Sequence, residues 1–473
     1  MAKSAVKGVS WTAGSIMIRA GLQFAQLLLV ARYLTPAELG VLAMINVIIG
    51  LAQIFGEAGL SNAIIYYKDL TAQQLNQLYL LNIGFGFIIT FIFFCLSQPL
   101  ANFFEMEDLA GMLLLIAPVF LIRSFSQQSI ALLQKELKFG LLAKAETLSA
   151  ILGFIVLLIF FISGFRAKAV IFGQLAGAGC LSLLVMFYNQ ARLPKLSYIY
   201  WSEIEIPVKY GLYQSGEACV NYLGSQFDRI FIGKMLGAEV LGIYSYIREL
   251  AFRPAYQFVN PIVHRVGFPM LAKHRDSHEL GYIYAKMLNL LALLNVPLYL
   301  LLVMFPSAVL GFVFGETWVE HSEILRWLAI YMLFMSFINP VGTLLRATGS
   351  VKRGFWWNIV IAAFRPAVIF FCIPYGITSV VKVLAIQQVF LFFAHWFVLI
   401  NPIVELSFRF FIGAFLRSII MFVVSYLIVY LLTFIFIDMK PLLQAVLVGV
   451  VYLVMLVPVI KKLVSDIRKS DGC

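Results

Sequence analysis

Residues 32–41 read RYLTPAELGV, and about 202 positions further along the chain residues 234–243 read KMLGAEVLGI. The identical residues that coincide in this gap-free alignment include Lys7 and Lys209, Gly14 and Gly216, Leu34 and Leu236, Leu39 and Leu241, and Gly40 and Gly242. Each stretch joins two long apolar segments, the first to the second and the seventh to the eighth. The repeat therefore predicts two six-helix halves. Because six is even, both halves should have the same orientation in a membrane, an arrangement found in alternating-access transporters.

The composition is that of a polytopic membrane protein. Of the 473 residues, 62% are hydrophobic and only 12% are charged, and the mean hydropathy is +0.94. Soluble domains usually carry about 25% charged residues. No polar stretch is long enough to fold as a separate soluble domain, so the whole chain is predicted to be one all-α membrane unit.

Apolar runs of about 20 residues predict about 14 transmembrane helices. They lie near residues 11–30, 39–65, 78–96, 113–133, 145–163, 169–187, 208–236, 241–263, 283–304, 324–345, 356–373, 377–399, 411–435 and 442–459. We expect an N-terminal six-helix bundle in residues 1–190 and a second bundle in residues 191–403. Residues 404–473 would then add two further helices and a basic tail.

Charge in the loops predicts the orientation. About 21 Lys and Arg residues lie in the loops on the side shared by both termini, against about 6 on the other side, so both termini are predicted to be cytoplasmic. The net charge of +12 is then a topology signal, and nucleic acid is not an expected partner. The five cysteines and five histidines show neither a disulfide framework nor metal-ligand spacing, so no metal site is expected.

Arginines lie inside several of these apolar segments, where each central Arg costs on the order of 2.5–3.5 kcal/mol. Such a cost indicates a water-filled cavity for a charged ligand. Guanidinium groups bind phosphate oxygens in pairs, whereas Lys offers a point charge, so the preference for Arg favours a phosphate-bearing ligand. The predicted substrate-binding residues are Arg19, Arg123, Arg248, Arg253 and Arg365.

Intramembrane carboxylates are the candidates for coupling transport to an ion gradient. They are Glu57, Glu217, Asp228 and Glu249. The expected coupling ion is sodium or a proton, and no other cofactor is expected, because the chain has no nucleotide-binding P-loop. A structural alternative stays open, in which the charges only neutralise one another, for example Arg19 with Glu57 and Glu249 with Arg253. The tyrosines around residues 213–256 are candidates for stacking on sugar rings, or for ordinary core packing.

Several loop motifs then suggest a family. QKELKF at 134–139, NPIVHRVGFP at 260–269, FGETW at 314–318 and NPVG at 339–342 resemble the polysaccharide transporters of the multidrug/oligosaccharidyl-lipid/polysaccharide flippase superfamily, and most of all its colanic acid exporter type. The resemblance covers nearly the whole chain. It implies two pseudo-symmetric bundles that form a V-shaped central cavity, followed by two C-terminal helices.

The resemblance also implies a function. The chain would be a flippase, not an enzyme, that moves undecaprenyl-pyrophosphate-linked oligosaccharide repeat units across a bacterial inner membrane for exopolysaccharide, capsule or O-antigen synthesis. Its expected partners are the lipid-linked substrate, the bilayer, and the polysaccharide polymerase and glycosyltransferase machinery. Two alternatives remain within the superfamily, an ion-coupled multidrug antiporter and a peptidoglycan-precursor flippase. A membrane glycosyltransferase or polymerase is disfavoured, because the longest loop has only about 20 residues.

Overall fold

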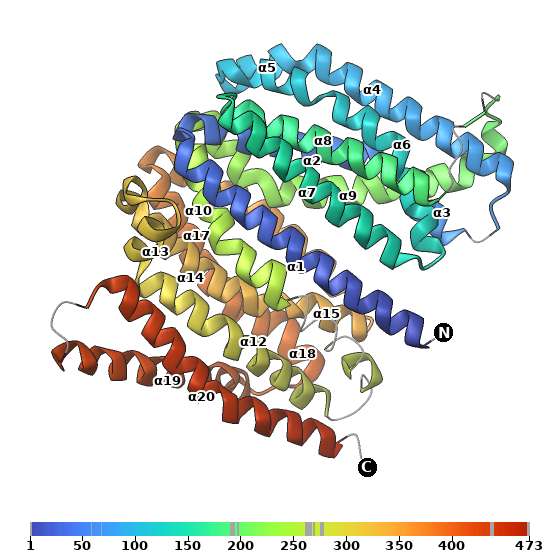
Figure 1. Cartoon of the computed structure of the whole chain (residues 1–473). Helices are drawn as coiled ribbons and strands as arrows, with labels where there is room; N and C mark the ends of the chain where they lie inside the picture. Colours follow the sequence, from blue (N-terminus) through green and yellow to red (C-terminus); the bar gives the residue numbers. More distant parts are fainter. Residues whose placement is uncertain are drawn as a thin grey trace. The chain divides into compact units, whose positions relative to one another are not determined.

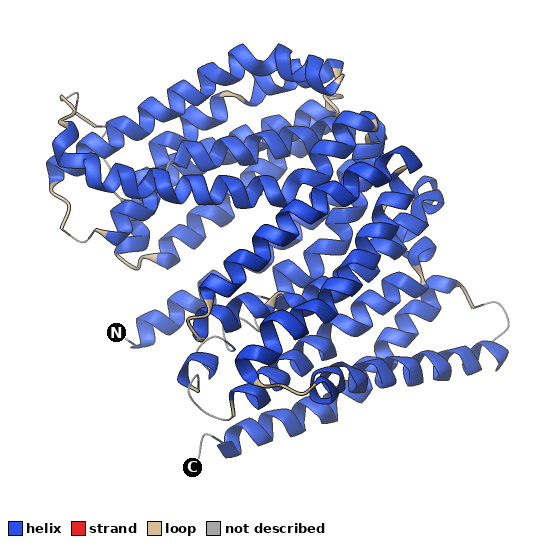
Figure 2. Ribbon diagram, turned by 180° about the vertical axis from the view of Figure 1, so that it is seen from behind, coloured by secondary structure: helices blue, strands red, loops and turns tan. Residues whose placement is uncertain are grey.

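The computed structural model describes the backbone of residues 2–57, 59–67, 69–189, 194–195, 198–260, 267, 270–274, 279–435 and 439–470. Side chains are described over the same ranges except residues 2–13, 56–57, 258, 351, 433–435 and 460–470. Every regular element in these ranges is a helix (Figures 1 and 2). The predicted all-α architecture is confirmed.

Two compact units divide the chain between Ser245 and Tyr246, inside one helix. The first unit contains α1 (Ala2–Tyr33), α2 (Pro36–Glu57), α3 (Leu60–Tyr66), α4 (Ala72–Phe104), α5 (Glu107–Ile116), α6 (Pro118–Lys135), α7 (Phe139–Ile162), α8 (Ala167–Tyr188), α9 (Trp201–Met235) and the first part of α10 (Gly237–Arg253). This unit extends beyond the domain boundary predicted at residue 190, because α9 packs against α2, α3 and α4.

The second unit continues from the end of α10 into a π-helix, η1 (Pro254–Val259). It then contains α12 (Leu280–Met304), α13 (Pro306–Val313), η2 (Glu316–His321), α14 (Ser322–Ile338), α15 (Pro340–Ala347), α16 (Val351–Cys372), η3 (Ile373–Tyr375), α17 (Ile377–His395), η4 (Trp396–Ile400), α18 (Asn401–Val404), α19 (Phe408–Ile435) and α20 (Pro441–Ser470).

The helices match the predicted spans. Within the described residues, twelve segments are long and apolar enough to cross a membrane, and they coincide with twelve of the fourteen predicted spans. The other two predicted spans are α9 and α10 followed by η1, which are helical but carry more charged residues. The chain is thus a multi-pass integral membrane protein.

Breaks inside three of the predicted spans occur at glycine or proline. The predicted span at 39–65 is interrupted at Gly59, which has a φ of 61° and so lies in the left-handed region that glycine tolerates. Pro118 and Pro340 each begin a new helix, α6 and α15, because proline supplies no N–H for the preceding helix.

The two copies of the internal repeat pack against each other within the first unit. A Cβ atom built on Gly40 of α2 would lie 1.7 Å from the carbonyl oxygen of Ala238, and one built on Gly242 of α10 would lie 1.9 Å from that of Pro36. Pro36 and Ala238 are equivalent positions in the repeat alignment, as are Gly40 and Gly242. The contact is therefore reciprocal, as in a two-fold interface.

The turn between α1 and α2 is held by charge as well. The carboxylate of Glu38 accepts a hydrogen bond from the backbone N–H of Thr35 at 2.8 Å. It also accepts two from Arg166, from Nε at 2.7 Å and from Nη2 at 2.6 Å. This bidentate pair raises the pKa of Arg166, in the loop before α8, above its ordinary value. The repeat turn is thereby tied to the α7–α8 connection.

Small residues allow α7 and α8 to approach closely. A Cβ atom on Gly153 would lie 2.8 Å from the carbonyl oxygen of Gly173, and one on Gly173 would lie 2.7 Å from that of Gly153. Small residues at such a crossing are the usual way for membrane helices to gain van der Waals contact, since lipid supplies little hydrophobic driving force between helices.

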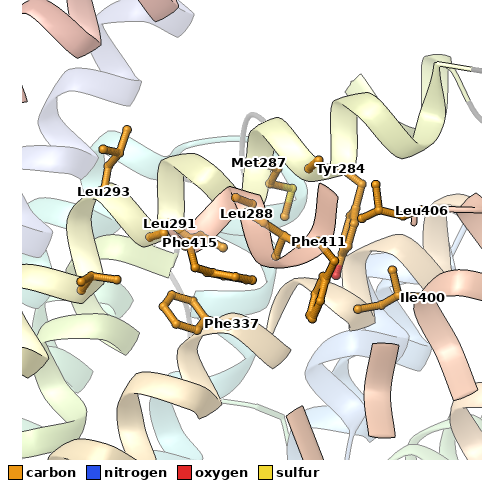
Figure 3. Close-up of a cluster of buried hydrophobic side chains, with 14 of the residues drawn as sticks. Tyr284, Met287, Leu288, Leu291, Leu293, Phe337, Ile400, Leu406, Phe411 and Phe415 are labelled. Atoms are coloured by element: carbon orange, nitrogen blue, oxygen red, sulfur yellow. The ribbon is translucent and has the colours of Figure 1, made fainter. Parts of the chain in front are cut away.

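The C-terminal helices are part of the core of the second unit. Figure 3 shows Phe411 and Phe415 of α19 with Leu288 and Leu291 of α12 and Phe337 of α14. In α20, the Tyr452 hydroxyl donates to the carbonyl oxygen of Leu293, in α12, at 3.0 Å. The two helices predicted to follow the second bundle therefore pack on it through a continuous buried surface.

Candidate functional site

The charged segment of α10 leads directly into a π-helical turn. Arg248, Glu249 and Arg253 occupy the last part of α10, and Pro254 begins η1. Proline cannot donate the backbone hydrogen bond of a regular α-helix, and single π-helical turns inside α-helices are frequent at functional sites. The irregular turn therefore lies next to the predicted arginines.

Aromatic rings extend from this segment to a second helix. The guanidinium carbon of Arg248 lies 4.1 Å from the centre of the Phe252 ring. Phe252 in turn stacks on Tyr256, with ring centres 5.8 Å apart, and on Tyr331 of α14, at 5.9 Å. Stacked rings and a guanidinium above a ring face are both favourable arrangements.

A third arginine reaches the same rings from α16. Nη2 of Arg365 donates a hydrogen bond of 2.8 Å to the Tyr331 hydroxyl, and its guanidinium carbon lies 5.8 Å from the Tyr331 ring centre. Three helices of the second unit thus contribute to one group of side chains. We call it the arginine-aromatic cluster, and it comprises Arg248, Glu249, Phe252, Arg253, Tyr256, Tyr331 and Arg365.

The cluster has more positive than negative charge, because it contains three arginines and one glutamate. Glu249 pairs with Arg253 at 3.1 Å, one turn away on the same helix. Nη1 of Arg253 and Nε of Arg365 are buried and have no acceptor among the described residues. A buried donor without an acceptor costs about 1–3 kcal/mol, so an anionic oxygen supplied by a ligand would stabilise this arrangement.

The two arginines predicted in the first unit are placed differently. Arg19 of α1 forms an ion pair with Glu146 of α7, with 2.9 Å between Nη1 and Oε2. Its charge is therefore neutralised by a residue that the sequence did not suggest as its partner. Arg123 lies half-buried on α6. The structure thus brings Arg248 and Arg365 to one group of aromatic rings, and Arg253 follows on the next turn of α10, paired with Glu249. The roles of Arg19 and Arg123 in substrate binding stay predictions.

The Arg19 ion pair makes a test possible. Arg19→Gln leaves the half-buried Glu146 carboxylate unpaired, so we expect the free energy of unfolding to fall by about 1–3 kcal/mol. Adding Glu146→Gln should restore most of this loss, because no unpaired charge remains. Thermal unfolding of the detergent-solubilised protein measures both. Transport by the stable double variant then tests the predicted role of Arg19 in substrate binding. A loss of transport would support that role, and normal transport would leave Arg19 as a structural partner of Glu146 alone.

The candidate coupling carboxylates lie in separate environments. Asp228 is buried in α9 and accepts a 2.6 Å hydrogen bond from the Tyr244 hydroxyl. Glu217 is exposed on the same helix, and Glu249 belongs to the cluster described above. The side chain of Glu57 lies outside the described residues, as does most of the motif at 260–269. Within the described residues, no His, Cys, Asp or Glu group could hold a metal ion.

Phe252 and Tyr331 were not predicted from the sequence. Phe252 follows Arg248 by four residues, so helical periodicity could have placed it on the same face. Tyr331 has no such signal, because it comes from a distant helix and meets α10 and α16 only in the folded chain.

Comparison with known proteins matches the chain to proteins of polysaccharide biosynthesis. Residues 29–323 match a family described as "Polysaccharide biosynthesis protein". The chain is 28% identical to lipopolysaccharide biosynthesis protein WzxC of Escherichia coli (strain K12), over 89% of this chain and 87% of the relative. It is 30% identical to teichuronic acid biosynthesis protein TuaB of Bacillus subtilis (strain 168), over 75% of this chain and 74% of the relative.

A solved structure shares the fold. The inward closed conformation of the lipid II flippase MurJ matches 97% of this chain and 100% of its own, with a TM-score of 0.76 and 16% sequence identity. At this level of identity the likeness concerns the fold.

Proposed function

Because this chain belongs to the polysaccharide biosynthesis protein family, we propose that it is a flippase for undecaprenyl-pyrophosphate-linked oligosaccharide repeat units. The sequence-based prediction of a polysaccharide transporter, and not an enzyme, is confirmed at the level of the family and of the fold. The relatives are named for the synthesis of different surface polymers, which supports a cargo built on a shared lipid carrier.

The arginine-aromatic cluster is the observation that carries this proposal. Its net positive charge and its unsatisfied guanidinium N–H groups suit the oxygens of a pyrophosphate. The adjoining rings of Phe252, Tyr256 and Tyr331 offer flat apolar faces and hydroxyls, which suit the alternating C–H and O–H surfaces of sugars. The lipid tail would stay in the bilayer while the cluster holds the headgroup.

Direction and energy supply are part of the same proposal. The protein would lie in a bacterial inner membrane with both termini in the cytoplasm, and it would release its cargo in the periplasmic leaflet for the polymerase. A sodium ion or a proton bound at an intramembrane carboxylate would bias the cycle, and Glu217, Asp228 and Glu249 are the candidates whose side chains the structure describes. Glycosyltransferases on the cytoplasmic side would supply the substrate.

Two other cargoes fit the same fold. A multidrug antiporter for cationic drugs should have an acidic binding site, and the excess of arginine in the cluster disfavours it. A peptidoglycan-precursor flippase would handle another anionic lipid, and the fold is shared with one. Gene essentiality separates a peptidoglycan-precursor flippase from a polysaccharide flippase. Loss of peptidoglycan synthesis is lethal, whereas loss of a surface polysaccharide is generally tolerated.

The decisive experiment follows the lipid-linked oligosaccharide in cells that lack the gene. We expect radiolabelled substrate to accumulate where an external glycosidase does not reach it, and to become accessible when the intact gene is restored. Unchanged lipid-linked pools together with altered drug tolerance would contradict the proposal and favour the antiporter.

A further inference from the structure

A second cationic site lies in the second unit, between α12 and α19. The two helices line an open pocket of about 510 Å³. Its polar and small lining residues are Tyr282, Lys286, Asn289, Arg409, Gly413 and Arg417. None of them belongs to the arginine-aromatic cluster, so this pocket is independent of the proposed transport function.

Helical spacing explains how the pocket forms. Arg409, Gly413 and Arg417 follow one another at intervals of four residues, so they form one stripe along α19. Gly413 lies between the two arginines, and a Cβ atom built on it would meet nothing within 4 Å. The missing side chain leaves open space in the middle of the stripe.

The pocket walls are held in place by the core. Phe411 and Phe415 are buried on a different face of α19 and pack against α12 (Figure 3). The amide of Asn289 donates a 3.1 Å hydrogen bond to the carbonyl oxygen of Ala414. The facing surface of α12 therefore keeps its position next to the stripe of α19.

The pocket collects positive charge without compensation. Lys286, Arg409 and Arg417 line it, and none of them has a carboxylate partner among the described residues. The ammonium group of Lys286 instead lies 4.5 Å from the centre of the Tyr282 ring. Three cations around one small space repel one another, so the arrangement favours a bound anion.

The surroundings of the pocket identify the kind of anion. Both helices are candidate membrane spans, and the neighbouring side chains Phe410 and Leu416 of α19 are 64% and 51% exposed. Arg409 lies at the start of α19, and Arg417 lies about 12 Å further along its axis. A ligand in this pocket thus touches cations near the end of a candidate membrane span and further inside it, with apolar side chains beside them.

We infer that the α12–α19 pocket binds the phosphate of a membrane lipid, with the acyl or prenyl chain lying along the exposed apolar residues of α19. Arg409 and Arg417 donate paired hydrogen bonds to the phosphate oxygens, and Lys286 adds a point charge. The lipid would hold α19 on α12 from outside.

Native mass spectrometry of the full-length protein in detergent tests this inference with added phosphatidylglycerol. We expect wild-type protein to retain the lipid, and the Lys286→Gln, Arg409→Gln, Arg417→Gln triple variant to bind it at least about tenfold more weakly. Gly413→Leu keeps every charge but fills the open space, so it should weaken binding similarly. Arg346→Gln, which changes an exposed arginine outside the pocket, is the control.

Two competition arms identify the source of the phosphate. Displacement of phosphatidylglycerol by undecaprenyl phosphate would support the site and assign it to the carrier lipid, and failure to displace would assign it to the phospholipids of the bilayer. Displacement by millimolar inorganic phosphate would overturn the requirement for a lipid. Equal binding by wild type and both pocket variants, all with matching melting temperatures in detergent, would overturn the site itself.

Discussion

Arg253→Ala combined with Arg365→Ala is expected to reduce translocation of the lipid-linked oligosaccharide about 100-fold or more. Hydrogen bonds to charged groups contribute about 1.5–3 kcal/mol each, and every 1.4 kcal/mol corresponds to a factor of about ten. Both guanidinium groups have a buried N–H without an acceptor in the described residues, so both are available to a ligand. The initial rate at which substrate becomes accessible to an external glycosidase measures the effect.

Three control variants separate charge, geometry and folding. Arg365→Lys keeps the charge but loses the planar pair of donors, so we expect an intermediate rate. Tyr331→Phe removes only the hydroxyl that accepts from Arg365 and should cost less than Arg365→Ala. Arg346→Ala changes an exposed arginine of the same unit and should transport normally. A double variant that is correctly inserted and transports at the wild-type rate would remove the cluster from the transport path.

Most of the fold could be predicted because membrane insertion imposes strong patterns on a sequence. A span needs about 20 apolar residues, and within the described residues each predicted span is helical apart from short breaks such as the one at Gly59. The breaks were harder to predict, since the apolar runs continue through Gly59 and Pro118. Hydropathy averaged over about 20 residues detects a span, but a helix break depends on one or two residues within the apolar run and hardly changes that average.

The candidate site was predictable only where its contacts are local. The pair of Glu249 and Arg253 follows from their spacing on one helix, and it was foreseen as one possible ion pair. Tyr331 and Arg365 meet across two helices, so nothing in their spacing indicates the contact. Arg19 illustrates the same limit, because its partner Glu146 lies on α7 and only tertiary packing selects it.

Gly40→Ala and Gly242→Ala are each expected to lower the free energy of unfolding by about 1–3 kcal/mol or more, because the new methyl group requires two helices to separate. The added Cβ atom would lie 1.7 Å from the Ala238 carbonyl oxygen in the first variant and 1.9 Å from the Pro36 oxygen in the second. Van der Waals repulsion forbids both distances. Thermal or denaturant unfolding of the detergent-solubilised protein measures the loss.

The reciprocal geometry predicts non-additivity as well. Once one substitution has separated α2 from α10, part of the space for the second methyl group is already open. The double variant should therefore lose less free energy of unfolding than the sum of the losses in the two single variants. Gly14→Ala and Gly216→Ala are matched controls, because these glycines are equivalent in the repeat and open space surrounds both. In a helix they should be neutral or stabilise by about 0.5–1 kcal/mol. If Gly40→Ala unfolded like Gly216→Ala, the two repeat turns would not be in contact in the folded protein.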